Sequence, residues 1–124
     1  MIGRLHHVVL DCPEPAALAA FYSSVLGQPV TYRSADFCVV SQDQTTSGLA
    51  FQLDHDHRRP TWPQPEVPQQ VHLDVMVDDV EAAGAAVVEL GAQRLSAGGV
   101  YADPAGHPFC LVRRPGWADP IRPG

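Results

Sequence analysis

The sequence predicts an α+β fold made of two βαβββ modules. Two stretches of the chain follow one pattern, in which an apolar segment carrying a histidine precedes an alanine-rich helical segment that stops at a glycine. His7 and Gly27 mark the first copy, and His72 and Gly91 mark the second. The copies are offset by about half of the 124 residues, which favours one duplicated supersecondary unit over a solenoid of many repeats.

The first module is expected to open with a strand at residues 5–11, which are rich in β-branched side chains. His7 and Asp11 share one face of this strand. Pro15 predicts the start of a helix, because its fixed φ suits the first helical position, and Gly27 is placed to end that helix. The apolar stripe of the helix comprises Leu18, Phe21, Tyr22, Val25 and Leu26.

Three more strands and a linker are expected after this helix. The strands span Val30–Arg33, Asp36–Ser41 and Gly48–Asp54. The polar segment that follows, His55–Gln69, is rich in proline, and proline is excluded from helix interiors and from central strands. We therefore interpret this segment as the connection between the two modules.

The second module repeats this order. In its opening strand Val71, Leu73, Val75 and Val77 face one way, and His72, Asp74 and Met76 face the other. Asp78, with Glu81 three residues later, resembles a capping box and predicts the start of a helix that ends at Gly91. The buried stripe of that helix is expected to comprise Val80, Ala83, Val87 and Leu90.

Three short strands complete the second module, and the DPAGHP segment is a turn between the last two. The strands are Gln93–Ser96, Val100–Asp103 and Pro108–Arg113. The expected organisation is a single domain over residues 1–124, with module 1 at about 5–55, the linker at about 56–69, module 2 at about 70–114 and an irregular tail at 115–124.

Composition narrows the classes of function. The formal net charge of −6 argues against a nucleic-acid partner, which requires a basic face. No apolar run approaches the length of a membrane helix and no secretory segment opens the chain, so we expect a cytoplasmic protein without a membrane partner. Three widely spaced cysteines without a CxxC motif are typical of reduced thiols.

One face of the predicted sheets collects polar side chains. His7 and His72 occupy equivalent strand positions, and Gln52 and Cys110 lie near the ends of equivalent last strands. If the two sheets close into one cup, these four side chains converge. Asp54 and Asp74 have the same parity on their strands and are further candidates for lining the pocket, although a solvent-facing acid is the ordinary interpretation of each.

Four segments carry a resemblance to a known superfamily: LHHVVLD, AFYSSVLG, VHLDVMVDDVEAA and DPAGHPFCLV. Over roughly residues 5–113 the chain resembles the vicinal oxygen chelate (VOC) superfamily of glyoxalase I, bleomycin-resistance proteins, methylmalonyl-CoA epimerase and extradiol dioxygenases. The resemblance implies two βαβββ modules whose curved mixed sheets form a cup around a small-molecule pocket. It also implies, for members of the glyoxalase I type, one divalent metal bound by four strand residues.

Carried over from this resemblance, the metal ligands are His7, Gln52 and His72, with Cys110 in the fourth position. Glutamate is expected there, because in glyoxalase I chemistry that carboxylate is both ligand and proton-transfer base. Zinc is the metal that best tolerates histidine and thiolate ligands, whereas hard cations such as Mg²⁺ prefer carboxylate ligands. A pocket without any metal is equally compatible, because free cysteine is among the most buried residue types and Cys110 lies between two apolar residues.

Two functions remain open from the sequence. One is a metal-assisted lyase or isomerase acting on a small oxygenated metabolite, other than ordinary glyoxalase I, with no catalytic residue identified. The other is a metal-free protein that binds a small molecule or sequesters an antibiotic, as in the bleomycin-resistance type. A homodimer is the expected assembly, since pairing two copies would complete the sheets. His6 is expected to be structural, His107 to belong to its turn, and Phe37 and Phe51 to lie in the core.

Overall fold

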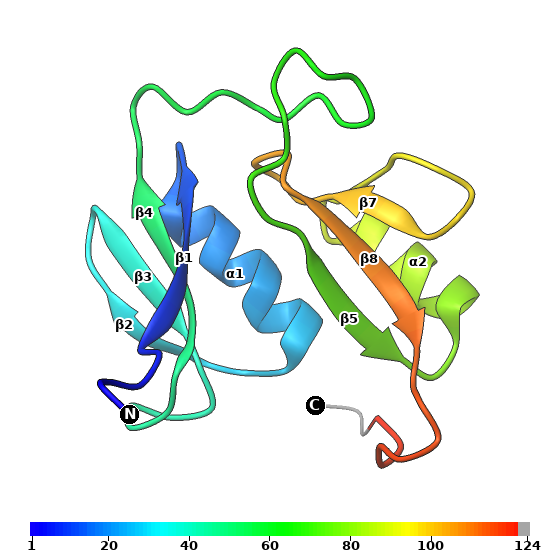
Figure 1. The fold of residues 1–124 in the computed structure, drawn as a ribbon, viewed down its shortest axis with the longest axis horizontal. Coiled ribbons are helices and arrows are strands. Elements are labelled where there is room, and N and C mark those ends of the chain that lie inside the picture. Colours follow the sequence, from blue (N-terminus) through cyan, green and yellow to red (C-terminus); the bar gives the residue numbers. More distant parts are fainter. Residues whose placement is uncertain (122–124) are drawn as a thin grey trace. The chain divides into compact units, whose positions relative to one another are not determined.

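The computed structural model describes residues 1–121 and confirms the α+β class and the two βαβββ modules (Figure 1). The first module consists of β1 (His7–Cys12), α1 (Pro15–Leu26), β2 (Val30–Arg33), β3 (Phe37–Val40) and β4 (Gly48–Leu53). The second consists of β5 (Leu73–Val77), α2 (Val80–Glu89), β6 (Gln93–Arg94), β7 (Val100–Ala102) and β8 (Pro108–Arg113). The predicted tail has no helix or strand at 115–121, and residues 122–124 lie outside the described residues.

Each module folds into a four-stranded mixed sheet with one topology. The strand orders are β1-β4-β3-β2 and β5-β8-β7-β6. In each sheet the first and last strands of the module pair in parallel, and the other neighbours pair antiparallel. The chain divides into two compact units, one spanning Met1–His57 and one beginning at Arg58.

Helix α1 begins and ends where the sequence predicts. Pro15 occupies its first turn, and Gly27 follows its last residue with a φ of 64°, which glycine adopts without strain. The helix lies against β3 and β4 (Figure 1). Tyr22 is fully buried and stacks on Phe51, with 5.5 Å between the ring centroids. Leu26 departs from the prediction, because the last turn of the helix leaves it exposed.

The register of β1 with β4 separates the two faces of the first sheet. His7 pairs with Gly48 and Asp11 pairs with Gln52, and paired residues share a face. Phe51 faces the helix, so these four residues lie on the opposite face. Phe37 and Val39 join them through the pairing of β3 with β4. The alternation predicted for β1 and β4 is therefore confirmed.

Helix α2 begins one residue later than the capping motif predicts. Asp79, and not Asp78, is the N-cap, and its carboxylate accepts a hydrogen bond from the Ala82 N–H at 3.0 Å. The carboxylate of Asp78 instead accepts hydrogen bonds from the Arg114 guanidinium and from the backbone N–H of Ile121. The earlier aspartate thus fastens the segment after β8, and the later one caps the helix.

The buried stripe of α2 also differs from the prediction. Val80 and Leu90 are exposed, whereas Gly84 and Val87 are buried. A Cβ atom on Gly84 would lie 2.3 Å from the hydroxyl oxygen of Tyr101, which is fully buried. The helix therefore packs on its sheet through its smallest residue.

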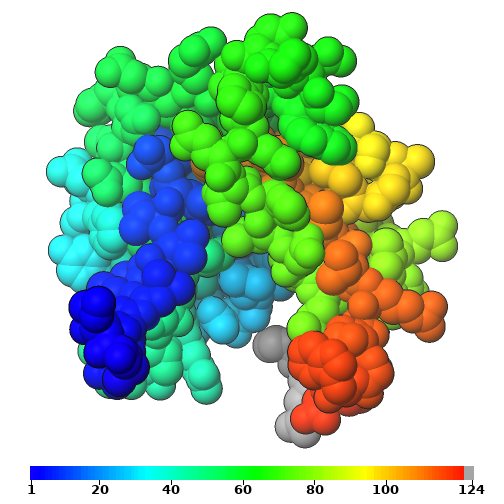
Figure 2. Space-filling model, in the orientation of Figure 1, coloured from blue at the N-terminus to red at the C-terminus, as the bar shows by residue number. Residues whose placement is uncertain are grey.

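The segment before β1 lies at the surface of the first unit, where Figure 2 draws it in dark blue. Met1 and Ile2 are fully exposed there. Among residues 1–121, no helix is both long enough and apolar enough to cross a membrane.

Replacement of Gly48 by alanine is expected to destabilise the protein by about 2 kcal/mol, because the new Cβ would lie 2.1 Å from the Val40 carbonyl oxygen and the backbone must move. Urea denaturation measures the loss. Gly98→Ala is the matched control, since its Cβ meets only Ser96 Oγ at 3.6 Å, and a change within about 0.5 kcal/mol is expected. Equal effects of the two substitutions would contradict the close packing at Gly48.

The contact between Asp78 and Arg114 predicts a dependence of stability on pH. The Arg114 hydrogen bond lowers the pKa of Asp78 from its ordinary value. A group whose pKa is lower in the folded state stabilises that state above its unfolded pKa, near pH 4, and this contribution disappears as the pH falls through the folded pKa. The free energy of unfolding should therefore fall less steeply below about pH 4 in Asp78→Asn than in the unchanged protein, as measured by denaturation at a series of pH values. Parallel curves would exclude the contribution.

Candidate functional site

An open pocket of about 700 Å³ lies on the face of the first sheet that points away from α1. Its walls come from β1, β2, β3 and the loop between β3 and β4. The lining residues are His6, His7, Thr31, Tyr32, Phe37, Val39, Ser41, Gln44, Thr45, Thr46 and Ser47. One end of the pocket is aromatic and apolar, and the other end carries imidazole and hydroxyl groups.

His7 is held in this pocket by the neighbouring strand of its own sheet. Its Nδ1 atom accepts a hydrogen bond from the backbone N–H of Gly48 at 3.1 Å, and Gly48 is its register partner on β4. A nitrogen that accepts a hydrogen bond carries no proton, so in the neutral ring the proton is on Nε2. The pKa of His7 is lowered from its ordinary value, first because burial disfavours the charged ring and second because His6 lies beside it.

His6 packs directly on His7. The two ring centroids are 3.8 Å apart and the planes are tilted by 35°. His6 precedes the first residue of β1, so it does not follow the alternation of the strand. Its ring lines the same pocket as His7, at the edge strand of the sheet.

The aromatic end of the pocket is formed by Tyr32 and Phe37. Their rings meet edge to face, with 6.3 Å between centroids. Phe37 was expected in the core, but it is only half-buried and lies at the pocket, whereas Phe51 is buried against α1 as predicted. Alternation in the sequence places Phe37 and Val39 on the same face of β3. Which face lines the pocket follows only from the pairing of β3 with β4.

Gln52 lies in a different place from His7. It lines a second pocket of about 480 Å³ with Asp36, Phe37, Leu53 and His55. Because Gln52 pairs with Asp11 while His7 pairs with Gly48, the two side chains start four residues apart along parallel strands, which is about 13 Å. The first unit therefore does not bring these two predicted ligands together.

The second unit gathers three of the predicted residues on one face. Asp74 pairs with Cys110 in the register of β5 and β8. The His72 Nε2 atom lies 3.6 Å from Asp74 Oδ1, and both side chains are about half exposed. Burial, followed by the negative charge of Asp74, raises the pKa of the Cys110 thiol. Both causes favour the neutral thiol over the thiolate.

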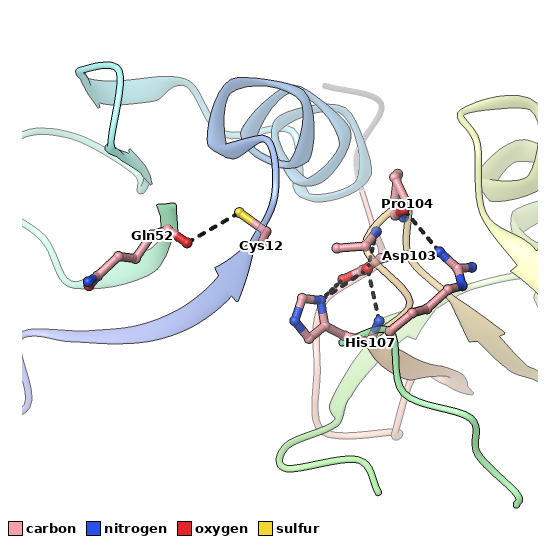
Figure 3. A network of polar contacts seen from close by, with 7 residues as sticks. Cys12, Gln52, Asp103, Pro104 and His107 are labelled. Atoms are coloured by element: carbon pink, nitrogen blue, oxygen red, sulfur yellow. Dashed lines mark hydrogen bonds and ion pairs between the residues drawn. The ribbon is translucent and has the colours of Figure 1, made fainter. Parts of the chain in front are cut away.

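Asp54 and His107 both belong to turns. The Asp54 carboxylate accepts the backbone N–H of Asp56 at 2.9 Å, just after β4. His107 Nδ1 lies 2.9 Å from the carboxylate of Asp103, which is fully buried and also accepts the N–H groups of Ala105 and His107 (Figure 3). The expectation that His107 is a turn residue is confirmed.

The linker is fastened to this turn. Arg59 donates to the Pro104 carbonyl oxygen at 3.1 Å and to Gln93 Oε1 at 3.4 Å. Gly106 has a φ of 95°, and a Cβ there would lie 2.2 Å from Arg59 Cγ. The charged residues of the linker therefore include one with a structural role, which the sequence pattern alone did not reveal.

The residues of the first unit do not fit a metal half-site. A histidine that binds a metal normally donates its second ring N–H to an acceptor, whereas His7 Nδ1 accepts from an N–H. Gln52 is too far along the sheet to share an ion with His7. Among residues 1–121, no three His, Cys, Asp or Glu side chains are placed to hold a metal ion. The metal set of His7, Gln52, His72 and Cys110 draws on both units and stays a prediction.

Comparisons with known proteins identify the family. A model of the glyoxalase-like domain matches residues 7–112. The chain belongs to the glyoxalase-like domain family. This places it in the VOC superfamily that the sequence motifs resemble. No curated protein matches this glyoxalase-like chain.

Solved structures share the fold of this glyoxalase-like protein at low identity. A glyoxalase/bleomycin resistance protein/dioxygenase family enzyme from Burkholderia phytofirmans matches with a TM-score of 0.66 and 19% identity, over 88% of this chain and 97% of its own. The bleomycin-binding protein of Streptomyces verticillus, complexed with copper(II)-bleomycin, matches with 0.56 and 17%, over 93% and 100%. The trypanothione-dependent glyoxalase I of Leishmania major matches with 0.59 and 16%, over 90% and 86%.

Replacement of Asp103 by alanine is expected to destabilise the protein by about 3 kcal/mol, because the N–H groups of Ala105 and His107 lose a buried acceptor. Asp43→Ala is the matched control. Asp43 also accepts a turn N–H, that of Thr45 at 2.8 Å, but it is exposed and water can replace it, so a loss of about 1 kcal/mol or less is expected. Urea denaturation measures the free energy of unfolding of both variants. Similar losses of stability would contradict the expectation that the buried carboxylate contributes more than the exposed one.

Proposed function

We propose that this glyoxalase-like protein binds a small organic molecule in the pocket beside His7 and needs no metal ion to do so. The observation that carries the proposal is the pocket itself. Its volume of about 700 Å³ lies in the range of small-molecule sites, which combine apolar walls with a few directed polar groups. Tyr32, Phe37 and Val39 supply the walls, and His7 supplies the directed polar group.

The family supports a role in ligand binding. Among the proteins that share the fold, the Streptomyces verticillus protein holds copper(II)-bleomycin, so this fold accommodates binding of a ligand that brings its own metal. The metal-assisted lyase or isomerase considered from the sequence has less support. It needs a base in the position of Cys110, and the raised pKa of that thiol disfavours such a role. The expected homodimer stays a prediction.

Benzophenone, with two aromatic rings and no reactive group toward the protein in the dark, is a suitable probe. Its addition should shift the backbone amide resonances of residues at the pocket, such as Tyr32, Val39 and Ser47, in nitrogen-resolved NMR spectra. Tyr32→Ala should weaken binding about threefold, because one edge-to-face or stacked aromatic contact contributes roughly 0.5–1.5 kcal/mol. Tyr32 is 55% exposed, so its truncation should leave the fold intact.

Val88→Ala is the matched control for this experiment, since Val88 is comparably exposed on α2 in the other unit. It should leave the affinity for benzophenone unchanged. If benzophenone shifts no resonance of the pocket, or if it shifts resonances elsewhere instead, the proposed binding site is wrong.

A further inference from the structure

We infer that His7 acts in this pocket as a fixed hydrogen-bond donor through Nε2, and that the pocket selects aromatic molecules that carry a carbonyl or another acceptor oxygen. This inference rests on the proposed function, because it names the class of ligand for the same pocket. It assigns His7 a role opposite to that of a metal ligand, which offers a lone pair and not a proton.

The donor that sets the His7 ring is part of the backbone. Gly48 reaches Nδ1 because the register of β1 and β4 places the two residues side by side. Any side chain at Gly48 would collide with the Val40 carbonyl oxygen, and with Ser41 Cβ at 2.7 Å. The position of this N–H is therefore fixed by close packing of β4 on the end of β3, and it cannot follow a rotation of the imidazole.

The opposite edge of the ring is consequently a donor. With Nδ1 accepting from Gly48, the neutral imidazole carries its proton on Nε2. The His6 ring lies against the same imidazole, with 3.8 Å between the ring centroids, which restricts rotation about the side-chain torsions of His7. A donor whose direction is held from two sides loses little freedom when a ligand binds.

The serine and threonine hydroxyl groups around the pocket cannot replace this donor. Ser41 donates to the Asp43 carbonyl oxygen at 2.7 Å, so the Thr31 hydroxyl, 2.6 Å from Ser41 Oγ, donates to Ser41 in turn. Three more hydroxyls in the loop donate to protein oxygens. These are Thr45 to the Asp43 carboxylate, Thr46 to the Asp43 carbonyl and Ser47 to the Leu5 carbonyl.

Each hydroxyl has one proton, so these five groups present only lone pairs to a ligand. They can accept a hydrogen bond from a ligand but cannot donate one to a carbonyl oxygen. His6, Tyr32 and Gln44 also line the pocket, but the His7 ring is the one whose orientation a backbone N–H sets, so a ligand oxygen at the imidazole end can accept a hydrogen bond from its Nε2. Such an oxygen left without a donor in a partly closed site costs free energy, and an oxygen that meets a preset donor gains it.

The aromatic walls define the rest of the ligand. Tyr32 and Phe37 present an edge-to-face pair, and Val39, which is 5% exposed, also lines the pocket. Flat rings gain both apolar burial and directed contacts against such walls. The two ends together fit an aryl ketone, an aromatic amide or a similar conjugated oxygen compound.

A matched pair of probes tests this inference. Benzophenone and diphenylmethane have nearly the same shape, and they differ in a carbonyl group that is replaced by a methylene. The ratio of the benzophenone affinity to the diphenylmethane affinity should be about fivefold higher in the unchanged protein than in a variant without the His7 donor, because one net hydrogen bond contributes ~1 kcal/mol. The different hydration of the two probes is the same for both proteins and cancels in this comparison. Affinities are measured from the NMR shifts of the pocket residues in the full chain.

Two substitutions of His7 separate its two nitrogens. Asparagine can place an oxygen near the position of Nδ1 and accept from Gly48, but it has no donor at the position of Nε2. Glutamine is long enough to place an amide N–H near Nε2. His7→Asn should reduce the preference for benzophenone over diphenylmethane about fivefold, and His7→Gln should retain most of it. If His7 only fills space, the His7→Gln variant is not expected to retain the preference for benzophenone.

The outcomes are distinct. If both probes bind in the pocket and His7→Asn leaves their affinity ratio unchanged, the inference is overturned while the proposed function stands. If neither probe binds in the pocket, the proposed function fails and the inference fails with it. If stoichiometric Zn²⁺ added to the full chain shifts the His7 resonances and abolishes the benzophenone preference, His7 is a metal ligand and the donor role is wrong.

Discussion

The hydrogen bond from Gly48 to His7 is the constraint on which the candidate site depends. It exists because β1 and β4 are adjacent parallel strands in one particular register, and because β4 can start against β3 only with a glycine. A shift by one residue would turn His7 to the helix face and remove it from the pocket. The polarity of the pocket thus follows from backbone packing and not from a choice among side chains.

The two modules share a topology and the register of their parallel strands, but Gln52 and Cys110 do not occupy equivalent positions in them. Four residues separate His7 from Asp11, the partner of Gln52, whereas two separate His72 from Asp74, the partner of Cys110. By this register Cys110 is equivalent to Ala50 and not to Gln52, so the predicted site residues of the two units are not equivalent positions. In the second unit they bring an imidazole, a carboxylate and a thiol to one face, and in the first they leave an imidazole and an amide in separate pockets. The duplication conserves architecture, and the chemistry of the two faces has diverged.

Much of the fold could be predicted, because periodicity and punctuation are local properties. Pro15, Gly27 and the alternation in β4 mark elements within a few residues, and the structure confirms them. The sequence does not identify Asp79 as the N-cap of α2, because Asp78 beside it has an identical side chain. Asp78 instead contacts Arg114, which lies 36 residues further along the chain. The pocket was harder to predict. Tyr32, Phe37 and Ser47 meet through sheet order, and the tautomer of His7 depends on a backbone N–H that no sequence motif encodes.

The protonation of the His7 ring tests this account most directly. Long-range proton–nitrogen correlation spectra of the ¹⁵N-labelled protein distinguish the two neutral tautomers by the chemical shifts of the ring nitrogens. The account predicts, near neutral pH, a proton on Nε2 and a Nδ1 resonance typical of an acceptor. A proton on Nδ1 would contradict it, because the Gly48 N–H could then not bind that nitrogen and Nε2 would be available as a lone pair.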